Sequence, residues 1–376
     1  MLRPISLWMM AMGLGLSACS ASPGVPAPAP PGESREPVEP PAPDEQVAAC
    51  AAQTSKLQAG LDKAHGNDTD AVMVVKDPSC GMRVLTSGPS KLDASHLHRI
   101  GSVTKTYVAA VILTLASEGA LGLEDPVAKF VSGVTGGDEI TVRQLLTHTS
   151  GLFNYTNDEQ FLQVARKKTF TPRELVDLAL ANPPSFAPGE GWEYSNTNYI
   201  LLGMIAEAAG KAKIGALVRA RVFAKVGLAA TFFDGEEPVG GELAIGRDGW
   251  GRDVTRFADP SWAWAAGAMV ASPADTATWI EALGAGTFHD PATQAQMLVP
   301  TTTDDKNLGY GLGVMLFGRA ITGGAGPGIG HGGDLPGYHT QAFYFPEKKT
   351  TLVAIVDSDA ESPNDVSVAA LEVLFR

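Results

Sequence analysis

The stretch that decides the fold is Ile100-Gly101-Ser102-Val103-Thr104-Lys105, where an expected strand meets an apolar helix. Serine is a poor nucleophile until a neighbouring base takes its proton, and a lysine three residues later on a helix lies on the same face. Lys105 is the only lysine in the sequence with a serine three positions before it. The pattern predicts Ser102 as a nucleophile and Lys105 as its base, while a capping serine and a solvated lysine are the alternative interpretation.

The segments on both sides of this junction predict one sheet built from the two ends of the chain. Apolar and alternating runs indicate strands at 71–76, 82–87, 338–345 and 350–356, and helices at 47–65 and 364–374. Further helices are expected at 103–118, 142–146, 173–181, 199–209, 214–226 and 273–283. This order implies an α+β fold, an antiparallel sheet flanked by N- and C-terminal helices with an inserted, mainly helical region. The cleft between the two regions is the natural place for a site.

A second polar motif, Tyr194-Ser195-Asn196, lies in a loop just before the apolar helix expected at 199–209. A tyrosine held near cations can move a proton between the serine and a leaving group. Asn196 can hold Lys105 or a substrate amide. The alternative is a half-buried aromatic and a helix cap, and Tyr155-Thr156-Asn157 repeats the pattern elsewhere. The context of the loop favours Tyr194.

The third motif, His331-Gly332-Gly333, precedes the strand expected at 338–345. Glycines let a substrate backbone approach, and histidine can donate a hydrogen bond or hold charge. The alternative is a glycine-rich loop over 323–333 with an exposed His331. A Gly-x-Gly-x-x-Gly pattern starts at Gly328, but it does not predict a nucleotide site because a strand follows it instead of a helix.

Taken in order, these three motifs resemble those of the penicillin-recognising serine enzymes, in the branch that holds class C β-lactamases, DD-carboxypeptidases and related esterases. The similarity extends over residues 46–376 and includes the stretches 145–152, 310–313 and 330–333. It implies a β-lactamase/transpeptidase-like fold and an acyl-enzyme mechanism that needs no metal or organic cofactor.

The resemblance also implies a role for each motif residue. Ser102 is the nucleophile, Lys105 and Tyr194 share the general base and acid roles, and Asn196 orients them. The predicted oxyanion hole consists of the backbone N–H groups of Ser102 and Asp334, and losing one such donor typically costs about 3 kcal/mol of barrier.

The third motif departs from the β-lactamase pattern. The resemblance implies that His331, with Gly332 and Gly333, anchors the substrate and supports Tyr194 electrostatically. β-Lactamases usually have lysine at the position of His331, and many relatives have threonine at that of Gly332. Because histidine carries less fixed positive charge at neutral pH, a weaker grip on a terminal carboxylate and inefficient cephalosporin hydrolysis are expected.

The N-terminal segment predicts export. Arg3 precedes an uncharged apolar stretch at 5–16 that ends in small residues, which is the layout of a secretory signal peptide over residues 1–18. The stretch is shorter than the ~20 residues that a membrane-spanning helix needs.

The signal is followed by a candidate lipid anchor. Leu16-Ser17-Ala18-Cys19 resembles a bacterial lipobox, which implies lipidation of Cys19 and a location in the periplasm or cell envelope, anchored in the outer membrane because Ser20 follows. Ordinary cleavage near Ala18 is the alternative. Residues 19–45 are rich in proline and are expected to form an extended tether to a hydrolase domain at 46–376.

The net charge limits the classes of partner, and the cysteines suggest a disulfide. The formal net charge of −13 argues against nucleic acid or anionic lipid as a partner.

If Cys19 carries a lipid, Cys50 and Cys80 remain as an even pair in an oxidising compartment. The helix from Cys50 rises ~22 Å and the following strand returns ~23 Å, so both cysteines are expected at one end as a disulfide. Two buried apolar cysteines are the alternative.

The leading functional hypothesis is a D-alanyl-D-alanine carboxypeptidase acting on peptidoglycan stem peptides. The alternatives are an esterase or β-lactamase of the same fold, acting on small esters or β-lactams, and a non-catalytic protein that binds cell-wall fragments or β-lactams. Family membership alone does not settle the substrate.

Overall fold

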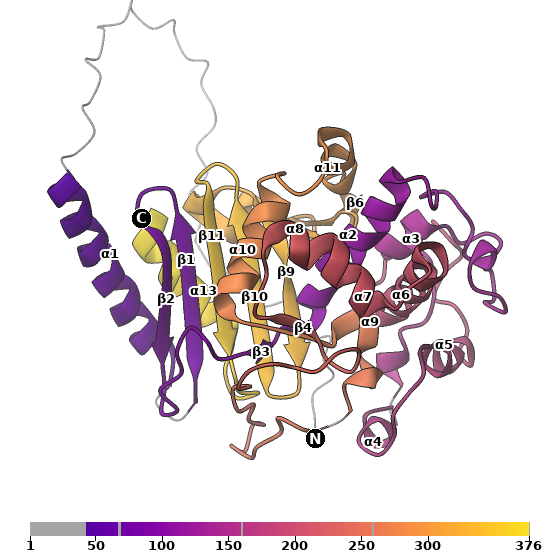
Figure 1. Cartoon of the computed structure of the whole chain (residues 1–376), viewed down its shortest axis with the longest axis horizontal. Coiled ribbons are helices and arrows are strands. Elements are labelled where there is room, and N and C mark those ends of the chain that lie inside the picture. The colour runs from indigo at the N-terminus through magenta and orange to yellow at the C-terminus, as the bar shows by residue number, and fades with distance from the viewer. Residues whose placement is uncertain (1–42, 67–68, 159–160, 258, 376) are drawn as a thin grey trace, which may run out of the picture.

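The computed structural model describes residues 43–66, 69–158, 161–257 and 259–375 (Figure 1). The expected signal peptide, Cys19 and nearly all of the tether lie outside these residues. Helix α1 begins at Pro43, three residues before the expected start of the domain. Among the described helices, none is both long and apolar enough to cross a membrane.

Eight strands of the described chain form one antiparallel sheet in the order β2-β1-β11-β10-β9-β8-β7-β6. The N-terminal hairpin therefore pairs directly with the last strand, as expected. The strands are β1 (Ala71–Asp77), β2 (Gly81–Ser87), β6 (Thr301–Thr302), β7 (Leu308–Tyr310), β8 (Met315–Phe317), β9 (Gly328–Leu335), β10 (Tyr338–Phe345) and β11 (Thr350–Val356).

Alternating side chains bury both faces of the sheet. On β1, Met73 belongs to an apolar cluster with helices α1 (Pro43–Ala64) and α13 (Pro363–Phe375), which pack on each other. Val72 and Val74 face the opposite way, into the larger core that the sheet shares with the helical region. Both faces are apolar because helices cover both, so the strands read as nearly continuous hydrophobic runs.

The helical region lies on the side of the sheet away from β1 and β2 (Figure 1). Helix α2 (Thr104–Ser117) is buried along most of its length, and α10 (Pro273–Gly284) packs on β1, β10 and β11. The other helices are α3 (Val142–Leu146), α4 (Phe161–Ala165), α5 (Pro172–Leu180), α6 (Asn196–Gly210), α7 (Ile214–Val218), α8 (Ala224–Val226), α9 (Trp264–Gly267), α11 (Pro291–Met297) and α12 (Arg319–Thr322).

The architecture confirms the predicted α+β fold, but three features differ from the expectation. The glycine-rich stretch before β10 is the strand β9, so His331 lies within the sheet and not in an exposed loop. The helix expected at 214–226 is interrupted by a π-helical segment at Arg219–Phe223. A small sheet was not expected: β3 (His98–Arg99) and β4 (Thr231–Phe233) pair with β5 (Met269–Ala271).

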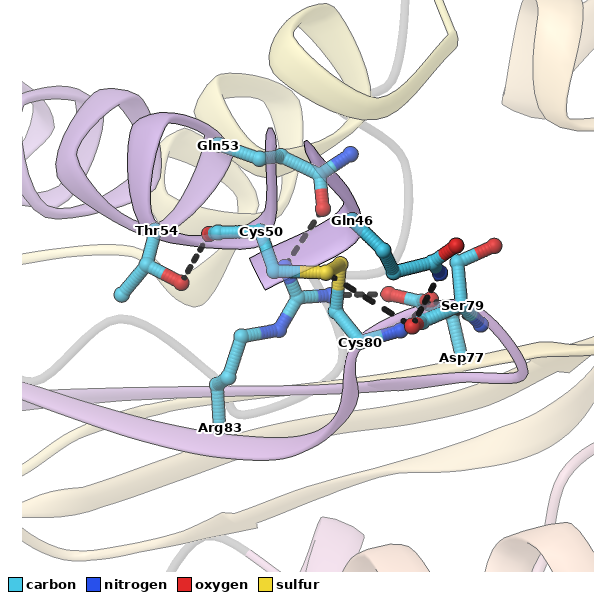
Figure 2. The surroundings of a disulfide bond; sticks show 8 residues. All are labelled: Gln46, Cys50, Gln53, Thr54, Asp77, Ser79, Cys80 and Arg83. Carbon is cyan, nitrogen blue, oxygen red and sulfur yellow. Dashed lines mark hydrogen bonds and ion pairs between the residues drawn. A yellow bond between two sulfur atoms is a disulfide. The ribbon is translucent and has the colours of Figure 1, made fainter. Parts of the chain in front are cut away.

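Cys50 and Cys80 form the predicted disulfide, with a Cα–Cα distance of 5.4 Å. Figure 2 shows that it ties α1 to the turn between β1 and β2. Arg83 lies beside it and bonds Gln53 of the helix and Asp77 of the hairpin. The disulfide and the Arg83 contacts therefore fix the N-terminal helix to the edge of the sheet.

Candidate active site

The nucleophile candidate lies where α2 crosses β9. A 3-10 turn, Gly101–Val103, leads into the helix, and Gly101 has a φ of +51°. A Cβ on Gly101 would lie 2.7 Å from the backbone nitrogen of Asp334, and one on Gly333 would lie 2.0 Å from the Ile100 oxygen. Two glycines therefore allow this close crossing.

The crossing brings together the two N–H groups that the sequence predicted as an oxyanion hole. Leu335 and Tyr338 close the β9–β10 hairpin, so the N–H of Asp334, one position earlier, points away from β10. The position of a Cβ on Gly333 is only 3.0 Å from the nitrogen of Ser102. The N–H of Asp334 on β9, beyond the residues that pair with β8, and the N–H of Ser102 in the adjoining turn therefore lie close enough to hold one carbonyl oxygen.

Lys105 is completely buried and contacts Ser102 directly. Its Nζ atom lies 2.9 Å from Ser102 Oγ, and it donates to Asn196 Oδ1 and to the Ala266 carbonyl, both at 2.7 Å. Burial holds the pKa of Lys105 well below its ordinary value, with the Asp334 carboxylate opposing the shift. A neutral Lys105 keeps two N–H bonds to the two carbonyl oxygens and turns its lone pair to Ser102, which is the arrangement a general base needs.

Tyr194 lies over the same lysine. Its ring centre is 5.0 Å from Lys105 Nζ. Its hydroxyl is buried without a hydrogen-bond partner of good geometry among the described residues. Burial raises the pKa of the Tyr194 phenol well above its ordinary value, while the Ser102 hydroxyl opposes the rise. At neutral pH Tyr194 therefore carries its proton and can serve as an acid toward a leaving group.

Asn196 joins the two tyrosine motifs that the sequence left in competition. Its amide nitrogen donates to the Thr156 hydroxyl, and its backbone N–H donates to Asn154. Tyr155 instead points to the Trp262 carbonyl, 2.7 Å away. The structure thus places Tyr194 at the nucleophile and uses the 155–157 turn to support Asn196.

His148 is a buried residue for which the sequence gave no role. Its Nδ1 accepts hydrogen bonds from the backbone N–H of Ser195 at 3.1 Å and the amide of Asn198 at 3.2 Å. Its ring centre lies 4.3 Å from that of Tyr194. Burial, followed by the positive charge of Lys105, holds its pKa well below the ordinary value. A neutral imidazole thus packs against Tyr194 and holds the next residue of its loop.

His331 is also completely buried and uncharged. The Tyr310 hydroxyl donates to its Nε2 over 2.9 Å, and its Nδ1 donates to the Gly332 carbonyl. Burial, followed by the charge of Lys105, lowers its pKa to about 3. Its ring centre is 6.1 Å from that of Tyr194. His331 therefore provides shape and a dipole beside Tyr194 but no fixed positive charge.

Asp334 takes part in a charged chain along the rim. Its carboxylate lies 2.7 Å from Nδ1 of His339, whose Nε2 lies 3.2 Å from Asp359. Burial lowers the pKa of His339, but the bonds to Asp334 and Asp359 outweigh it and raise the pKa to about 9. One imidazolium thus stands between two carboxylates, and the rim keeps a net negative charge.

Every predicted catalytic and substrate-binding residue of the described chain lies at or beside this crossing, from Ser102 and Lys105 to Asp334. The roles that the sequence missed belong to Tyr310, His148 and the Ala266 carbonyl. Tyr310 and His148 lie in the stretches 310–313 and 145–152, whose resemblance to the serine enzymes was the available signal. A backbone carbonyl such as that of Ala266 leaves no sequence signal.

The comparisons with known proteins agree with this geometry. A family model described as Beta-lactamase matches residues 22–375. A D-stereospecific amidohydrolase from Streptomyces sp. has a similar structure, with a TM-score of 0.76, 31% identity, and coverage of 84% of this chain and 97% of that protein.

Two curated relatives are similar over parts of their length. Penicillin-binding protein 4* of Bacillus subtilis (strain 168) is 25% identical, over 76% of this chain and 66% of the relative. Esterase EstB of Burkholderia gladioli is 33% identical, over 38% of this chain and 40% of the relative. The matches thus span less than two thirds of these two relatives.

Proposed function

The chain belongs to the β-lactamase family of serine hydrolases, and we propose that it cleaves amide or ester bonds of D-amino acid compounds through an acyl-enzyme at Ser102. The contact between Lys105 and Ser102 carries the mechanism. The uncharged His331 and the negative rim at Asp334 beside the oxyanion hole support the choice of substrate.

The acylation step uses the groups at the crossing. Ser102 Oγ attacks the carbonyl carbon while its proton passes to Lys105, and the carbonyl oxygen takes up negative charge between the N–H groups of Ser102 and Asp334. The tetrahedral intermediate collapses, the C–N or C–O bond breaks, and Tyr194 gives its proton to the departing atom. Lys105 then returns a proton to Tyr194. In deacylation, a water molecule attacks the carbonyl carbon of the acyl-enzyme while its proton passes to Lys105. Tyr194 then gives its proton to the departing Ser102 Oγ, and Lys105 returns a proton to Tyr194.

Among the described residues of the substrate-binding edge, the one imidazolium, His339, is already held between Asp334 and Asp359, so no further cation faces a terminal carboxylate. His331 is neutral, Gly332 has no hydroxyl, and Asp334 adds a negative charge. Burying a carboxylate without a partner is costly, so a free D-alanine carboxylate at this edge is disfavoured. Amides and esters avoid this cost, and similarity to the D-stereospecific amidohydrolase supports the D configuration.

A D-alanyl-D-alanine carboxypeptidase is the second candidate. Similarity over 76% of the chain to a protein named for penicillin binding favours it. The part of β9 beyond Gly330, where pairing with β8 ends, also offers backbone groups that can pair with an extended peptide.

We further propose that the protein acts in the cell envelope, anchored by a lipid on Cys19. The Cys50–Cys80 disulfide supports an oxidising compartment. Incorporation of radiolabelled palmitate into the full-length chain, lost in Cys19→Ala, is the expected result. An unlabelled wild-type chain would favour ordinary cleavage near Ala18.

The activity test uses matched substrates on the wild type and Ser102→Ala. D-Alanyl-p-nitroanilide should be hydrolysed faster than its L enantiomer, and faster than acetyl-D-alanyl-D-alanine loses its terminal residue. Ser102→Ala should show no turnover, whereas Ser117→Ala, at the exposed end of the same helix, should match the wild type. Equal turnover by the wild type and Ser102→Ala would contradict the proposed mechanism.

Intact mass after mixing with a penicillin separates the remaining alternatives. A lasting wild-type adduct together with release of D-alanine favours the carboxypeptidase. A transient adduct with drug consumed indicates a β-lactamase. Binding of cell-wall fragments by both forms, without turnover by either, would indicate a non-catalytic binding protein.

A further inference from the structure

A cavity of about 280 Å³ opens beside the oxyanion strand, and none of the roles given above uses it. It lies between β9 and β10, the loop before β7, helix α12 and the start of α13. Gly332 and Asp334 of β9 line it, and they flank Gly333, which touches Ser102. The cavity therefore begins within one residue of the contact with the nucleophile.

Gly332 helps to keep this space open. A Cβ at that position would meet no heavy atom closer than the Thr340 oxygen at 3.7 Å. The backbone would therefore accept a side chain at Gly332, so the backbone packing does not require glycine there. With glycine, the volume that a side chain would occupy is left to the cavity.

The lining combines apolar walls with negative charge. Leu308, Met315 and Phe343 supply apolar surface, and Asp305 and Asp334 supply carboxylates. Among the described residues that line the cavity there is no lysine or arginine. Its only cationic candidate, His339, already lies between Asp334 and Asp359. Such a lining suits an aliphatic chain that ends in a cation.

The position of Tyr194, the proposed acid, indicates which part of the substrate enters the cavity. The departing atom must approach Tyr194, whose ring lies 6.1 Å from that of His331. His331 is followed directly by Gly332, where the cavity begins. Pairing of β9 with β8 ends at Gly330, so the leaving group can pass from Tyr194 over the open edge of β9 to the cavity, while the acyl group remains on Ser102.

We propose that the cavity is a leaving-group site that selects an alkyl amine carrying a second, positively charged amine at its far end. This inference rests on the proposed amide hydrolysis and names the class of leaving group. The apolar walls hold the methylene chain, and the carboxylates of Asp305 and Asp334 attract the terminal ammonium.

The test compares three amides with the same D-alanyl group. Their amines have equal length and end in ammonium, methyl or carboxylate: 1,4-diaminobutane, pentylamine and 5-aminopentanoate. The kcat/KM of the ammonium substrate should exceed that of the carboxylate substrate about tenfold or more, with the methyl substrate between them, because the cavity carboxylates attract the ammonium and repel the carboxylate.

A matched pair of variants locates the effect. Asp305→Asn removes a carboxylate from the cavity wall, and Asp304→Asn removes the neighbouring exposed carboxylate, which does not line it. Asp305→Asn should lower the ammonium-to-carboxylate ratio about threefold, the size typical of an exposed ion pair. Asp304→Asn should change the ratio less.

The outcomes distinguish this inference from the proposed function. If none of the three amides is hydrolysed while acetyl-D-alanyl-D-alanine is, the proposed function fails and the inference fails with it. Equal rates on all three amides would overturn the inference and leave amide hydrolysis standing. A preference for the carboxylate substrate would also overturn it and favour the carboxypeptidase. Equal effects of Asp304→Asn and Asp305→Asn would exclude the cavity as the source of selectivity.

Discussion

The Nζ atom of Lys105 lies 2.9 Å from the Oγ atom of Ser102, one helical turn away, with no solvent access to the lysine. Burial makes the ammonium form costly, and two carbonyl oxygens fix the direction of the amine. The same residue pair thus supplies both the nucleophile and a base whose pKa burial holds well below its ordinary value.

Tyr194→Phe tests whether the phenol protonates the leaving group. Phe keeps the ring against His148 and Lys105 but removes the only proton that Tyr194 can give. Turnover of an alkyl amide should fall by about 10²–10⁴-fold, whereas a p-nitrophenyl ester, whose leaving group needs no proton, should lose much less. Steady-state kinetics on both substrates measures the difference. Equal losses on the two would show that Tyr194 is needed for another step.

His148→Phe tests whether the imidazole positions Tyr194. Phenylalanine retains an aromatic ring but leaves the Ser195 N–H without its acceptor, which typically costs about 1–3 kcal/mol for a buried donor. Because the loop of Tyr194 loses its anchor, kcat for the alkyl amide should fall more than kcat for the p-nitrophenyl ester, with KM little changed.

Trp192→Phe is the matched control for His148→Phe. Trp192 also packs on His148, edge-on at 6.3 Å, but makes no hydrogen bond to it. It should keep the amide-to-ester ratio of the wild type. If His148→Phe lowers thermal stability and leaves that ratio unchanged, His148 has a structural role only.

The candidate catalytic motifs could be found in the sequence because the spacing of neighbouring residues determines which side chains can act together. Ser102 and Lys105 share one helix face, and Asn196 starts a helix that the apolar pattern already indicated. The disulfide followed from the lengths of one helix and one strand. These inferences need only short-range geometry, which the sequence records directly.

The missed features depend on contacts between distant segments. Strand β9 escaped prediction because its glycines have low strand propensity, and pairing with β10 and β8 overrides that preference. The backbone of His148 is left-handed, with a φ of +61°, and this conformation brings its side chain to Tyr194. A histidine in the sequence does not predict such a conformation. The helix break at Arg219–Phe223 likewise has no glycine or proline to mark it.

Removing the disulfide should lower the stability of the domain. Cys50 and Cys80 are separated by 30 positions, and closing a loop of that size reduces the entropy of the unfolded chain. The loop-entropy relation gives about 3–4 kcal/mol, to be measured by urea unfolding of Cys50→Ser/Cys80→Ser. Turnover at 25 °C should remain, because α1 lies on the face of the sheet away from Ser102. A double variant as stable as the wild type would contradict this expectation.

The His339 network should make stability fall as pH rises above neutral. The folded pKa of about 9 lies above the ordinary value of 6.5, so the protonated histidine stabilises the fold fully below pH 6.5. That contribution is lost as pH rises through 9, and a shift of this size corresponds to about 3 kcal/mol. Relative to the wild type, His339→Gln should lose the decline in unfolding free energy between pH 6.5 and 9.5, measured by urea unfolding across that range.

A double variant, Asp334→Asn/Asp359→Asn, keeps the imidazole without its carboxylate partners and should behave in the same way. If instead the double variant declines with pH as the wild type does, groups other than this carboxylate–imidazolium–carboxylate chain are responsible.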